Sequence, residues 1–443
     1  MPTITILTAI LWHFPLVVLV GLASYLVYQK RRSSSVYLLD FECHRPPPSY
    51  RFPTATFHEL IYLDDRVDPE SRAFLIKIIQ KSGYSEETSI PPPNAVNPVM
   101  PSITHARDEA ASIIFATVQN LLSVTNISPR AIDVLICNSS MFSPTPSLTA
   151  MVVNEFKMRS NVLSYNLSGM GCSAGIVSIA LARDLLKARR NSLALIVSME
   201  VLSLNWYGGK IPSMLVTNCL FRMGGAALLM SSRNHDKCSA KYELQHLVRT
   251  NKAREDRCYA CVYQDVDPDN KTGVSISKAI PNVAGETLKA NMVSLAPLVL
   301  PYSEQVRYVW SAIREKVRII GRKDAYMPNF KKAFKHFCIH AGGKAVIEAA
   351  EKNLGLSKED VEASEMTLHK FGNTSSSSIW YELAYLETKR KIKTGDRVWQ
   401  IAFGSGFKCN SAVWKCISSQ HTRTADAWKG KIKTDLIKEK NLL

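Results

Sequence analysis

The most informative part of the sequence reads Asn166-Leu-Ser-Gly-Met-Gly-Cys172-Ser-Ala-Gly-Ile176. Gly169 and Gly171 allow the tight turn that a strand needs when it leads directly into a helix. Such a turn places Cys172 at the helix N-terminus, where the helix macrodipole favours the nucleophilic thiolate. The segment therefore predicts a strand–turn–helix unit that carries a nucleophile. A buried cysteine at a tight strand–helix joint is the alternative interpretation.

The segments around this unit alternate between short apolar runs and amphipathic helices. Three apolar runs are typical of strands buried on both faces: 132–137, 193–198 and 226–231. The spacing of apolar residues predicts helices over 106–123 and 173–190. This alternation predicts a layered α/β fold.

A second round of the same kind follows, which predicts two similar halves, although no literal repeat is visible. Its predicted elements are a strand pair (242–249 with 257–264), a short strand (337–340), two helices (342–353 and 375–388) and a buried strand (397–403). The predicted domain organisation is a membrane anchor with a basic flank (1–32), a proline-punctuated connector and N-terminal extension (33–101), a first half (102–235), a second half (236–420) and a basic tail (421–443).

Two further segments carry polar residues at predicted strand ends. His340 follows an apolar run and precedes two glycines, and Asn373 lies at a loop-to-helix junction rich in serine. A core histidine and a helix-capping asparagine are the alternative interpretations. Together with Cys172, however, the three residues can converge at one edge of a sheet. Cys and His can transfer acyl groups, and His and Asn can hold an enolate oxygen, so the combination suits carbon–carbon bond formation from a thioester.

The N-terminal segment predicts a membrane anchor. Residues 1–29 contain no Asp, Glu, Lys or Arg, and Lys30, Arg31 and Arg32 follow at once. About 20 apolar residues span a bilayer as a helix. Because the positive charge follows the apolar stretch, we expect an uncleaved anchor with the body in the cytosol. A re-entrant or interfacial helix is the alternative.

Composition narrows the classes of partner and cofactor. Lys and Arg number 55 and Asp and Glu 38, a net charge of +17 that favours anionic partners. The ten cysteines are scattered, which indicates reduced thiols. Cys258 and Cys261 form one C-x-x-C pair without the second pair that a zinc ribbon needs, so no metal is expected. No aromatic-and-basic RNA motif occurs, so nucleic acid is not an expected partner.

Four motifs resemble the plant 3-ketoacyl-CoA synthases, the condensing enzymes of very-long-chain fatty acid elongation. They are G-M-G-C-S-A-G (169–175), N-C-L-F-R-M-G-G-A-A (218–227), H-A-G-G-K (340–344) and F-G-N-T-S-S-S-S-I-W-Y-E-L (371–383), and the resemblance runs from about Tyr37 to Trp414. It implies a thiolase-like layered αβαβα fold. It also implies a decarboxylative Claisen condensation of a long-chain acyl-CoA with malonyl-CoA, without cofactor, giving a very-long-chain 3-oxoacyl-CoA, CoA and CO2.

The resemblance also implies roles for individual residues. Cys172 would take the acyl chain, and His340 and Asn373 would assist decarboxylation of malonyl-CoA and steady the enolate. Supporting residues would be Gly406, whose N–H would complete an oxyanion hole with that of Cys172, and His336 and His369, which would orient neighbours. Implied partners are a membrane, a second copy in a homodimer, and the reductase and dehydratase of an elongase complex at the endoplasmic reticulum.

The sequence departs from this family at two positions. Asn251 replaces a histidine that most members carry, and Thr217 replaces a usual proline. One membrane segment is visible where many members show two. Two other functions therefore stay open: a non-catalytic relative that modulates an elongase, and a polyketide-type synthase that uses other starter thioesters.

Overall fold

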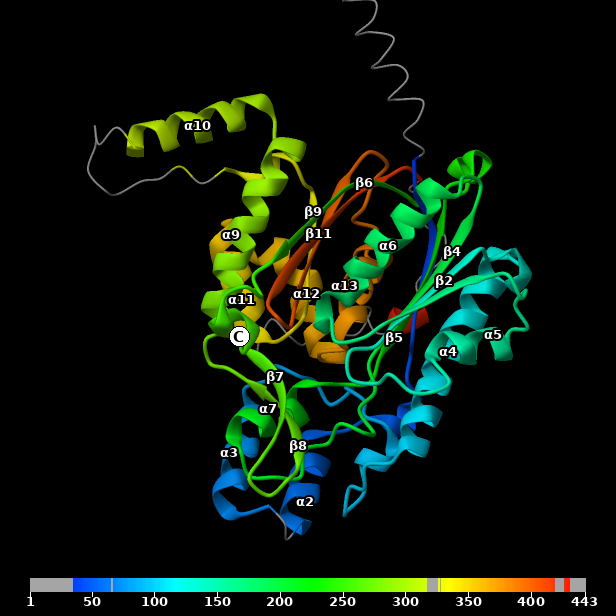
Figure 1. The fold of residues 1–443 in the computed structure, drawn as a ribbon. Helices are drawn as coiled ribbons and strands as arrows, with labels where there is room; N and C mark the ends of the chain where they lie inside the picture. Colours follow the sequence, from blue (N-terminus) through cyan, green and yellow to red (C-terminus); the bar gives the residue numbers. More distant parts are fainter. Residues whose placement is uncertain (1–34, 65–66, 317–325, 327, 419–425, 431–443) are drawn as a thin grey trace, which may run out of the picture.

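The computed structural model describes residues 35–64, 67–316, 326, 328–418 and 426–430 (Figure 1). The strands are β1 (Tyr37–Cys43), β2 (Val134–Asn138), β3 (Leu163–Leu167), β4 (Leu193–Met199), β5 (Gly225–Ser231), β6 (Tyr242–Asn251), β7 (Val262–Val266), β8 (Thr272–Ile276), β9 (His336–Ile339), β10 (Arg397–Gly404) and β11 (Lys408–Cys416). The helices are α2 (Thr54–Leu63), α3 (Pro69–Gln80), α4 (Ile103–Thr125), α5 (Leu148–Glu155), α6 (Ala174–Ala188), α7 (Pro212–Leu220), α8 (Asp256–Tyr259), α9 (Ile280–Val299), α10 (Tyr302–Lys316), α11 (Lys344–Leu354), α12 (Lys358–Phe371) and α13 (Ser378–Thr388).

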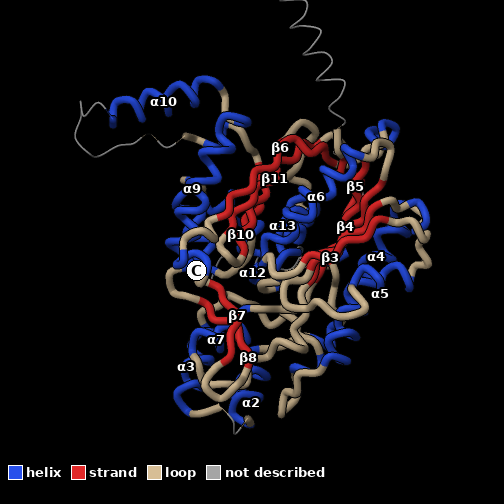
Figure 2. Tube along the Cα trace, in the orientation of Figure 1, coloured by secondary structure: helices blue, strands red, loops and turns tan. Residues whose placement is uncertain are grey.

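Nine strands form one sheet in the order β3-β2-β4-β5-β1-β6-β11-β10-β9. The two halves of this sheet are joined where β1 pairs with β6, and only Tyr37 and Leu38 of β1 take part in that pairing. Away from this junction the halves separate and face each other across α6 and α13 (Figures 1 and 2).

Alternate residues along the strands pack into different layers, as the period of a strand requires. In β2, Val134 and Ile136 pack toward the central helices α6 and α13, whereas Leu135 and Cys137 pack toward α4 and α5. On the other half, Val398 of β10 faces the central helices and the next residue faces α9 and α11. The layers are therefore αβαβα, as the resemblance to the condensing enzymes implied.

The two halves repeat one topology. In the first half, β2 and β4 are parallel, β4 and β5 antiparallel, and β5 and β1 antiparallel. In the second half, β9 and β10 are parallel, β10 and β11 antiparallel, and β11 and β6 antiparallel. Helices α6 and α13 precede the equivalent strands β4 and β10. The similarity of the halves thus lies in strand order and direction.

Local sequence explains where the best-predicted elements begin and end. Helix α4 begins after Ser102, whose hydroxyl accepts the N–H of Thr104 at 3.2 Å. It ends at Asn126, which adopts a left-handed conformation with φ of 52°. Four apolar residues of its buried face (Ala110, Ile113, Val118 and Leu121) follow helical spacing.

Two parts of the fold differ from the local predictions. Residues 37–43, which fall in the predicted connector and N-terminal extension, form β1 in the middle of the sheet, because this strand finds its partners far along the chain in β5 and β6. The predicted strand pair over 242–264 does not form: β6 pairs with β1 and β11, and β7 pairs with β8. Asp256–Tyr259 between them is helical. A local pattern reveals a strand but not its distant partner.

Residues before the first predicted half also contribute to a separate cap. Helices α2 and α3 pack with α7 around a cluster that includes Phe57, Leu75 and Met214. The β7–β8 hairpin lies against α7, where Gly273 has no room for a Cβ beside Met214 and Tyr207. Figure 1 shows this cap below the layered body.

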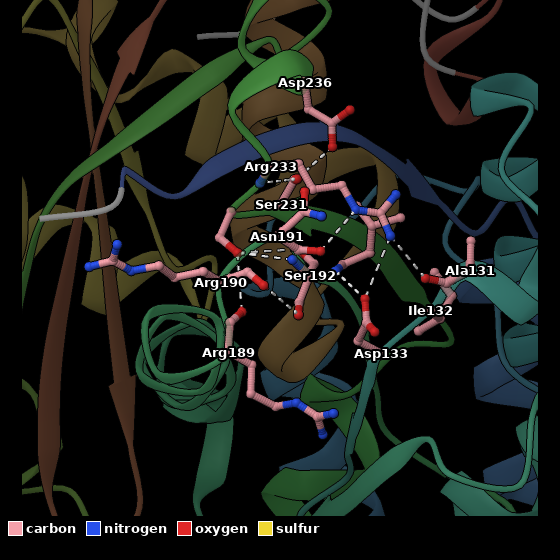
Figure 3. A network of polar contacts seen from close by, with 12 residues as sticks. Ala131, Ile132, Asp133, Arg189, Arg190, Asn191, Ser192, Ser231, Arg233 and Asp236 are labelled. Carbon is pink, nitrogen blue, oxygen red and sulfur yellow. Dashed lines mark hydrogen bonds and ion pairs between the residues drawn. The ribbon is translucent and has the colours of Figure 1, made fainter. Parts of the chain in front are cut away.

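A polar network fixes the end of α6 that lies far from Cys172 (Figure 3). Asp133 accepts the N–H of Leu193 at 2.8 Å and pairs with Arg233 at 3.6 Å. The Arg233 guanidinium also donates to the carbonyl oxygens of Asn191 and Ala131, each at 3.4 Å. These bonds hold the α6–β4 turn against β2 and β5, so α6 is held at both ends.

The predicted anchor (1–32) and most of the predicted basic tail (421–443) lie outside the described residues. Within the described part, none of the helices combines the length and apolar character that a membrane crossing requires.

Candidate active site

A cavity of about 600 Å³ lies where the two halves meet the cap. Cys172 comes from the first half, and His340 and Asn373 come from the second; all three line this cavity. The structure therefore brings together the three residues that the sequence singled out.

Cys172 lies in a 3-10 turn, Gly171–Ser173, between β3 and α6. Gly171 has a φ of +63°, and a Cβ there would lie 2.3 Å from the backbone nitrogen of Ser405 in the β10–β11 turn. Only glycine fits such an approach. Further along, a Cβ on Gly175 would lie 2.6 Å from the carbonyl oxygen of Ser376. Because of these close contacts, the Cys172 turn and the start of α6 pack directly against the β10–β11 turn at Ser405 and against the 3-10 turn at Ser376.

The environment of Cys172 favours the thiol over the thiolate. Burial raises its pKa to about 11, and the charge of Glu200 acts in the same direction. The hydroxyl of Ser375, which donates to Sγ at 3.5 Å, opposes this shift. Burial thus acts against the thiolate that the sequence predicted at this helix N-terminus. The nucleophile needs a base.

His340 lines the same cavity as Cys172. It directly follows β9. Its backbone N–H donates to the carbonyl oxygen of Ile401 in β10 at 2.9 Å, which extends the hydrogen bonding between these two strands by one residue. Its Nδ1 lies 2.6 Å from the hydroxyl of Ser378 at the start of α13. Burial lowers the pKa of His340 to about 4. The ring is therefore neutral at pH 7, with one nitrogen that accepts a proton and one that donates.

Asn373 lies between α12 and the 3-10 turn Ser375–Ser377. Its Oδ1 accepts the N–H of Ser375 at 2.8 Å, and its Nδ2 donates to the carbonyl oxygen of Gly342 at 3.2 Å. Its own carbonyl accepts the N–H of Arg222 at 2.9 Å. The buried amide is thus fixed with its N–H group on the side of the His340 loop.

The other residues singled out by the sequence lie elsewhere. Three of them do not line the cavity in the described part of the chain: His336, His369 and Gly406. Nε2 of His336 lies 3.1 Å from Asp396, and Nδ1 of His369 lies 2.9 Å from the carbonyl oxygen of Gly83. Gly406 has a φ of +81° in the β10–β11 turn, and its neighbours Ser405 and Phe407 do line the cavity.

The two departures from the usual family pattern differ in position. Asn251 is the exposed last residue of β6, its Oδ1 accepts the N–H of Ala253 at 2.9 Å, and it does not line the cavity. Thr217 does line it, from α7, where its hydroxyl donates to the carbonyl oxygen of Met214 at 2.7 Å. Of the two, only Thr217 is placed to contact a bound molecule.

Sequence reasoning missed two residues beside Cys172. Glu200 follows β4, and its carboxylate accepts the N–H groups of Ser140 and Met141 at 3.0 Å each. Burial raises its pKa. The hydroxyl of Ser375 lies 3.5 Å from Glu200 as well as from Cys172. The sequence did contain a signal for Glu200, since this charged residue directly follows the apolar run that ends at Met199. Ser375 stood among four serines without any signal.

Comparison with solved structures defines the class of fold. A type III polyketide synthase, 1,3,6,8-tetrahydroxynaphthalene synthase from Streptomyces coelicolor A3(2), is 20% identical with a TM-score of 0.65, covering 86% of this chain and 99% of that one. CsyB complexed with CoA-SH is 22% identical with a TM-score of 0.66, covering 86% and 100%. The protein therefore has the thiolase-like fold of these synthases.

Comparison of sequences defines the family. Residues 28–317 match the FAE1/Type III polyketide synthase-like proteins, and residues 331–416 match the 3-Oxoacyl-[acyl-carrier-protein (ACP)] synthase III C-terminal family. Among relatives from Arabidopsis thaliana, "Probable 3-ketoacyl-CoA synthase 21" is 58% identical, covering 92% of this chain and 88% of that one. "3-ketoacyl-CoA synthase 5" is 51% identical, covering 91% and 82%. The chain belongs to the 3-ketoacyl-CoA synthase family, which confirms the resemblance seen in its motifs. It is accordingly a condensing acyltransferase of fatty acid elongation.

Proposed function

We propose that this protein condenses a long-chain acyl-CoA with malonyl-CoA through an acyl-cysteine intermediate. The products are a very-long-chain 3-oxoacyl-CoA, CoA and CO2. The observation that carries this proposal is the shared cavity: Cys172, His340 and Asn373 line one end of a space whose other walls are largely apolar.

The first half-reaction loads the acyl chain onto Cys172. Neutral His340 takes the proton of the thiol, and the thiolate attacks the thioester carbon of acyl-CoA. Backbone N–H groups of Cys172 and of the Gly406 turn stabilise the oxyanion. When the tetrahedral intermediate collapses, the C–S bond to CoA breaks, and the departing thiolate receives the proton from His340.

The second half-reaction forms the carbon–carbon bond. Malonyl-CoA loses its carboxylate as CO2, and the electron pair moves into an enolate. The Nδ2–H of Asn373 and the ring N–H of His340 donate to the enolate oxygen. The enolate carbon then attacks the acyl thioester, the C–S bond to Cys172 breaks, and the released thiolate takes up one proton from solvent to restore the thiol. An apolar site favours the first step because it destabilises the malonyl carboxylate more than the spread charge of the enolate.

The rest of the cavity matches the two ends of an acyl-CoA. Apolar side chains from the cap and from α9 can hold an alkyl chain: Ile78, Val216, Leu220, Val262, Ile276 and Ala284. Exposed lysines from three different segments, Lys81, Lys278 and Lys344, also line the cavity. We assign them to the phosphates of CoA, since ammonium groups pair with phosphate oxygens.

Lys344→Ala is expected to raise KM for malonyl-CoA about tenfold with little change in kcat, because one charged contact to phosphate is worth roughly 1–2 kcal/mol. The effect should diminish at high salt. Lys352→Ala is the matched control, since Lys352 is exposed on the same helix but does not line the cavity. Equal KM values for the two variants would remove Lys344 from the CoA site.

The N-terminal apolar segment supports a further part of the proposal. We assign residues 1–32 to a single-pass anchor in the endoplasmic reticulum membrane, with the catalytic body facing the cytosol. In that position the protein would work with the reductase and dehydratase of an elongase complex, and as a homodimer. The scheme uses no metal or cofactor, because Cys172 stores the acyl chain, His340 moves the thiol proton, and backbone N–H groups with His340 and Asn373 stabilise the oxyanion and the enolate.

An elongation assay tests the function. Microsomes from a host without very-long-chain condensing activity would express this chain and receive labelled malonyl-CoA with a series of acyl-CoA primers. We expect labelled 3-oxoacyl product from long-chain primers. Product only from aromatic starter thioesters would instead indicate a polyketide-type synthase. No product from any primer, with the protein present in the membrane, would indicate the modulator.

A further inference from the structure

Helix α10 carries a row of exposed apolar side chains. Tyr302 is 85% exposed, Val306 67%, Val309 54% and Trp310 57%. Residues at these spacings lie on one face of a helix. Figures 1 and 2 show α10 projecting from the end of α9, away from the layered body. We call these four residues the α10 stripe.

The opposite face of α10 is fixed to the protein. Glu304 is fully buried. Its carboxylate accepts hydrogen bonds from the ammonium of Lys332 at 2.6 Å and from the backbone N–H of Asn329 at 3.1 Å. Ser311, two turns along the same face, accepts the N–H of Tyr326 at 2.8 Å. Because these hydrogen bonds fix the inward face of α10, the orientation of the helix is defined and its apolar side chains face outward.

The sequence of α10 and of the segment that follows it is rich in basic residues. The sequence from Tyr302 to Lys335 contains nine Lys and Arg against three Asp and Glu. On α10 itself, Arg307 is exposed beside the stripe, with a side-chain exposure of 63%. Tyrosine and tryptophan beside basic residues are typical of a helix that lies at a lipid–water interface.

The base of α10 and the start of β1 lie at the same end of the sheet. Tyr37 pairs with Glu243, which pairs with Lys415, which pairs with Arg397. Arg397 in turn donates to the carbonyl oxygen of Val299, the last residue of α9. Three strand spacings, about 15 Å, separate β1 from β10 across this row. The chain that enters β1 at this end comes from the apolar segment of residues 4–28.

We propose that the α10 stripe docks the catalytic body on the surface of an anionic lipid bilayer. The apolar and aromatic side chains enter the interface, and the exposed guanidinium of Arg307 lies among acidic headgroups. This inference rests on the membrane association proposed above. The anchor would hold one corner of this end of the protein and α10 a second, so the body has a fixed orientation on the membrane.

The test uses photo-crosslinking in the full chain on native microsomes. p-Benzoyl-phenylalanine replaces Trp310 in one variant and Tyr263 in the control; Tyr263 is 40% exposed on β7, in the cap. After irradiation, mass spectrometry measures phospholipid adducts on the labelled peptide. We expect at least about tenfold more lipid adduct at position 310 than at 263. Additional Val306→Glu and Val309→Glu substitutions should remove most of the adduct at 310.

Two outcomes would overturn the proposal: no excess of lipid adduct at position 310, or adducts there with a polypeptide, whether a second copy or another protein. Extraction of the membranes at alkaline pH tests the anchor separately. A chain that resists extraction but forms no lipid adduct at 310 keeps its anchor and refutes the α10 contact. A chain that is extracted yet forms the adduct refutes the anchor and supports α10.

Discussion

Cys172→Ala is expected to abolish condensation, with turnover falling by about four orders of magnitude or more, because no other group replaces the nucleophile that stores the acyl chain. Labelled malonyl-CoA and a long-chain primer measure the product, and mass spectrometry measures acyl chain on the protein. Within the part of the chain that the structure describes, the Cys172 side chain accepts one long hydrogen bond, from Ser375 at 3.5 Å, so alanine should leave the free energy of unfolding within about 1 kcal/mol of the original.

Cys238→Ala is the matched control for this experiment. Cys238 is exposed and lies away from the cavity, so its removal should leave both product and acyl-protein unchanged. Product formation by Cys172→Ala above about a hundredth of the original rate would contradict the acyl-cysteine mechanism.

Asn373→Asp is expected to lower malonyl-CoA decarboxylation about 100- to 1000-fold, which is the usual cost of losing one oxyanion donor. Aspartate retains an oxygen for the N–H of Ser375, so the local turn keeps its shape. It loses the Nδ2–H group and adds negative charge where the enolate oxygen would lie. Loading of the acyl chain on Cys172 should continue, because that step does not use Asn373.

The test is whether Asn373→Asp loses decarboxylation while it still loads the acyl chain. Release of labelled CO2 measures decarboxylation, and acyl-protein measures loading. Asn234→Asp, an exposed substitution of the same kind, should affect neither. Equal loss of loading and decarboxylation in Asn373→Asp would indicate a damaged fold or a different role for this residue.

The sequence predicted the elements whose signals are local. Strands β2, β4 and β5 are nearly continuous apolar runs, β10 is apolar from Val398 to Phe403 except for Gln400, and α4 and α6 have apolar residues at helical spacing. Strand β1 lacked such a signal because Asp40 and Glu42 interrupt its apolar residues. Asp40 is accommodated by Lys241 at 2.6 Å, a contact that exists only once the distant chain segments meet.

The same distinction explains the site. Cys172, His340 and Asn373 were found because each lies at the end of a predicted strand or at the start of a predicted helix. The position of the Ser375 hydroxyl depends on its left-handed backbone, with a φ of +57°. It also depends on the contact with Glu200, which belongs to the opposite half of the fold. The raised pKa of Cys172 was missed for a similar reason, because burial by the second half cannot be read from the turn that holds the cysteine.

The central place of β1 has a consequence for biosynthesis. Tyr37 leaves the ribosome early, but its partners Ser231 and Glu243 follow roughly 190 residues later, about 10–40 s at ordinary rates of translation. During that interval the newly made strand has two open edges, and such edges readily pair with the wrong chain. Asp40 and Glu42 act as gatekeepers in this period, since charged residues in an unpaired strand discourage aggregation. The acidic residues that hide β1 from sequence analysis also protect the nascent chain until its neighbours have been made.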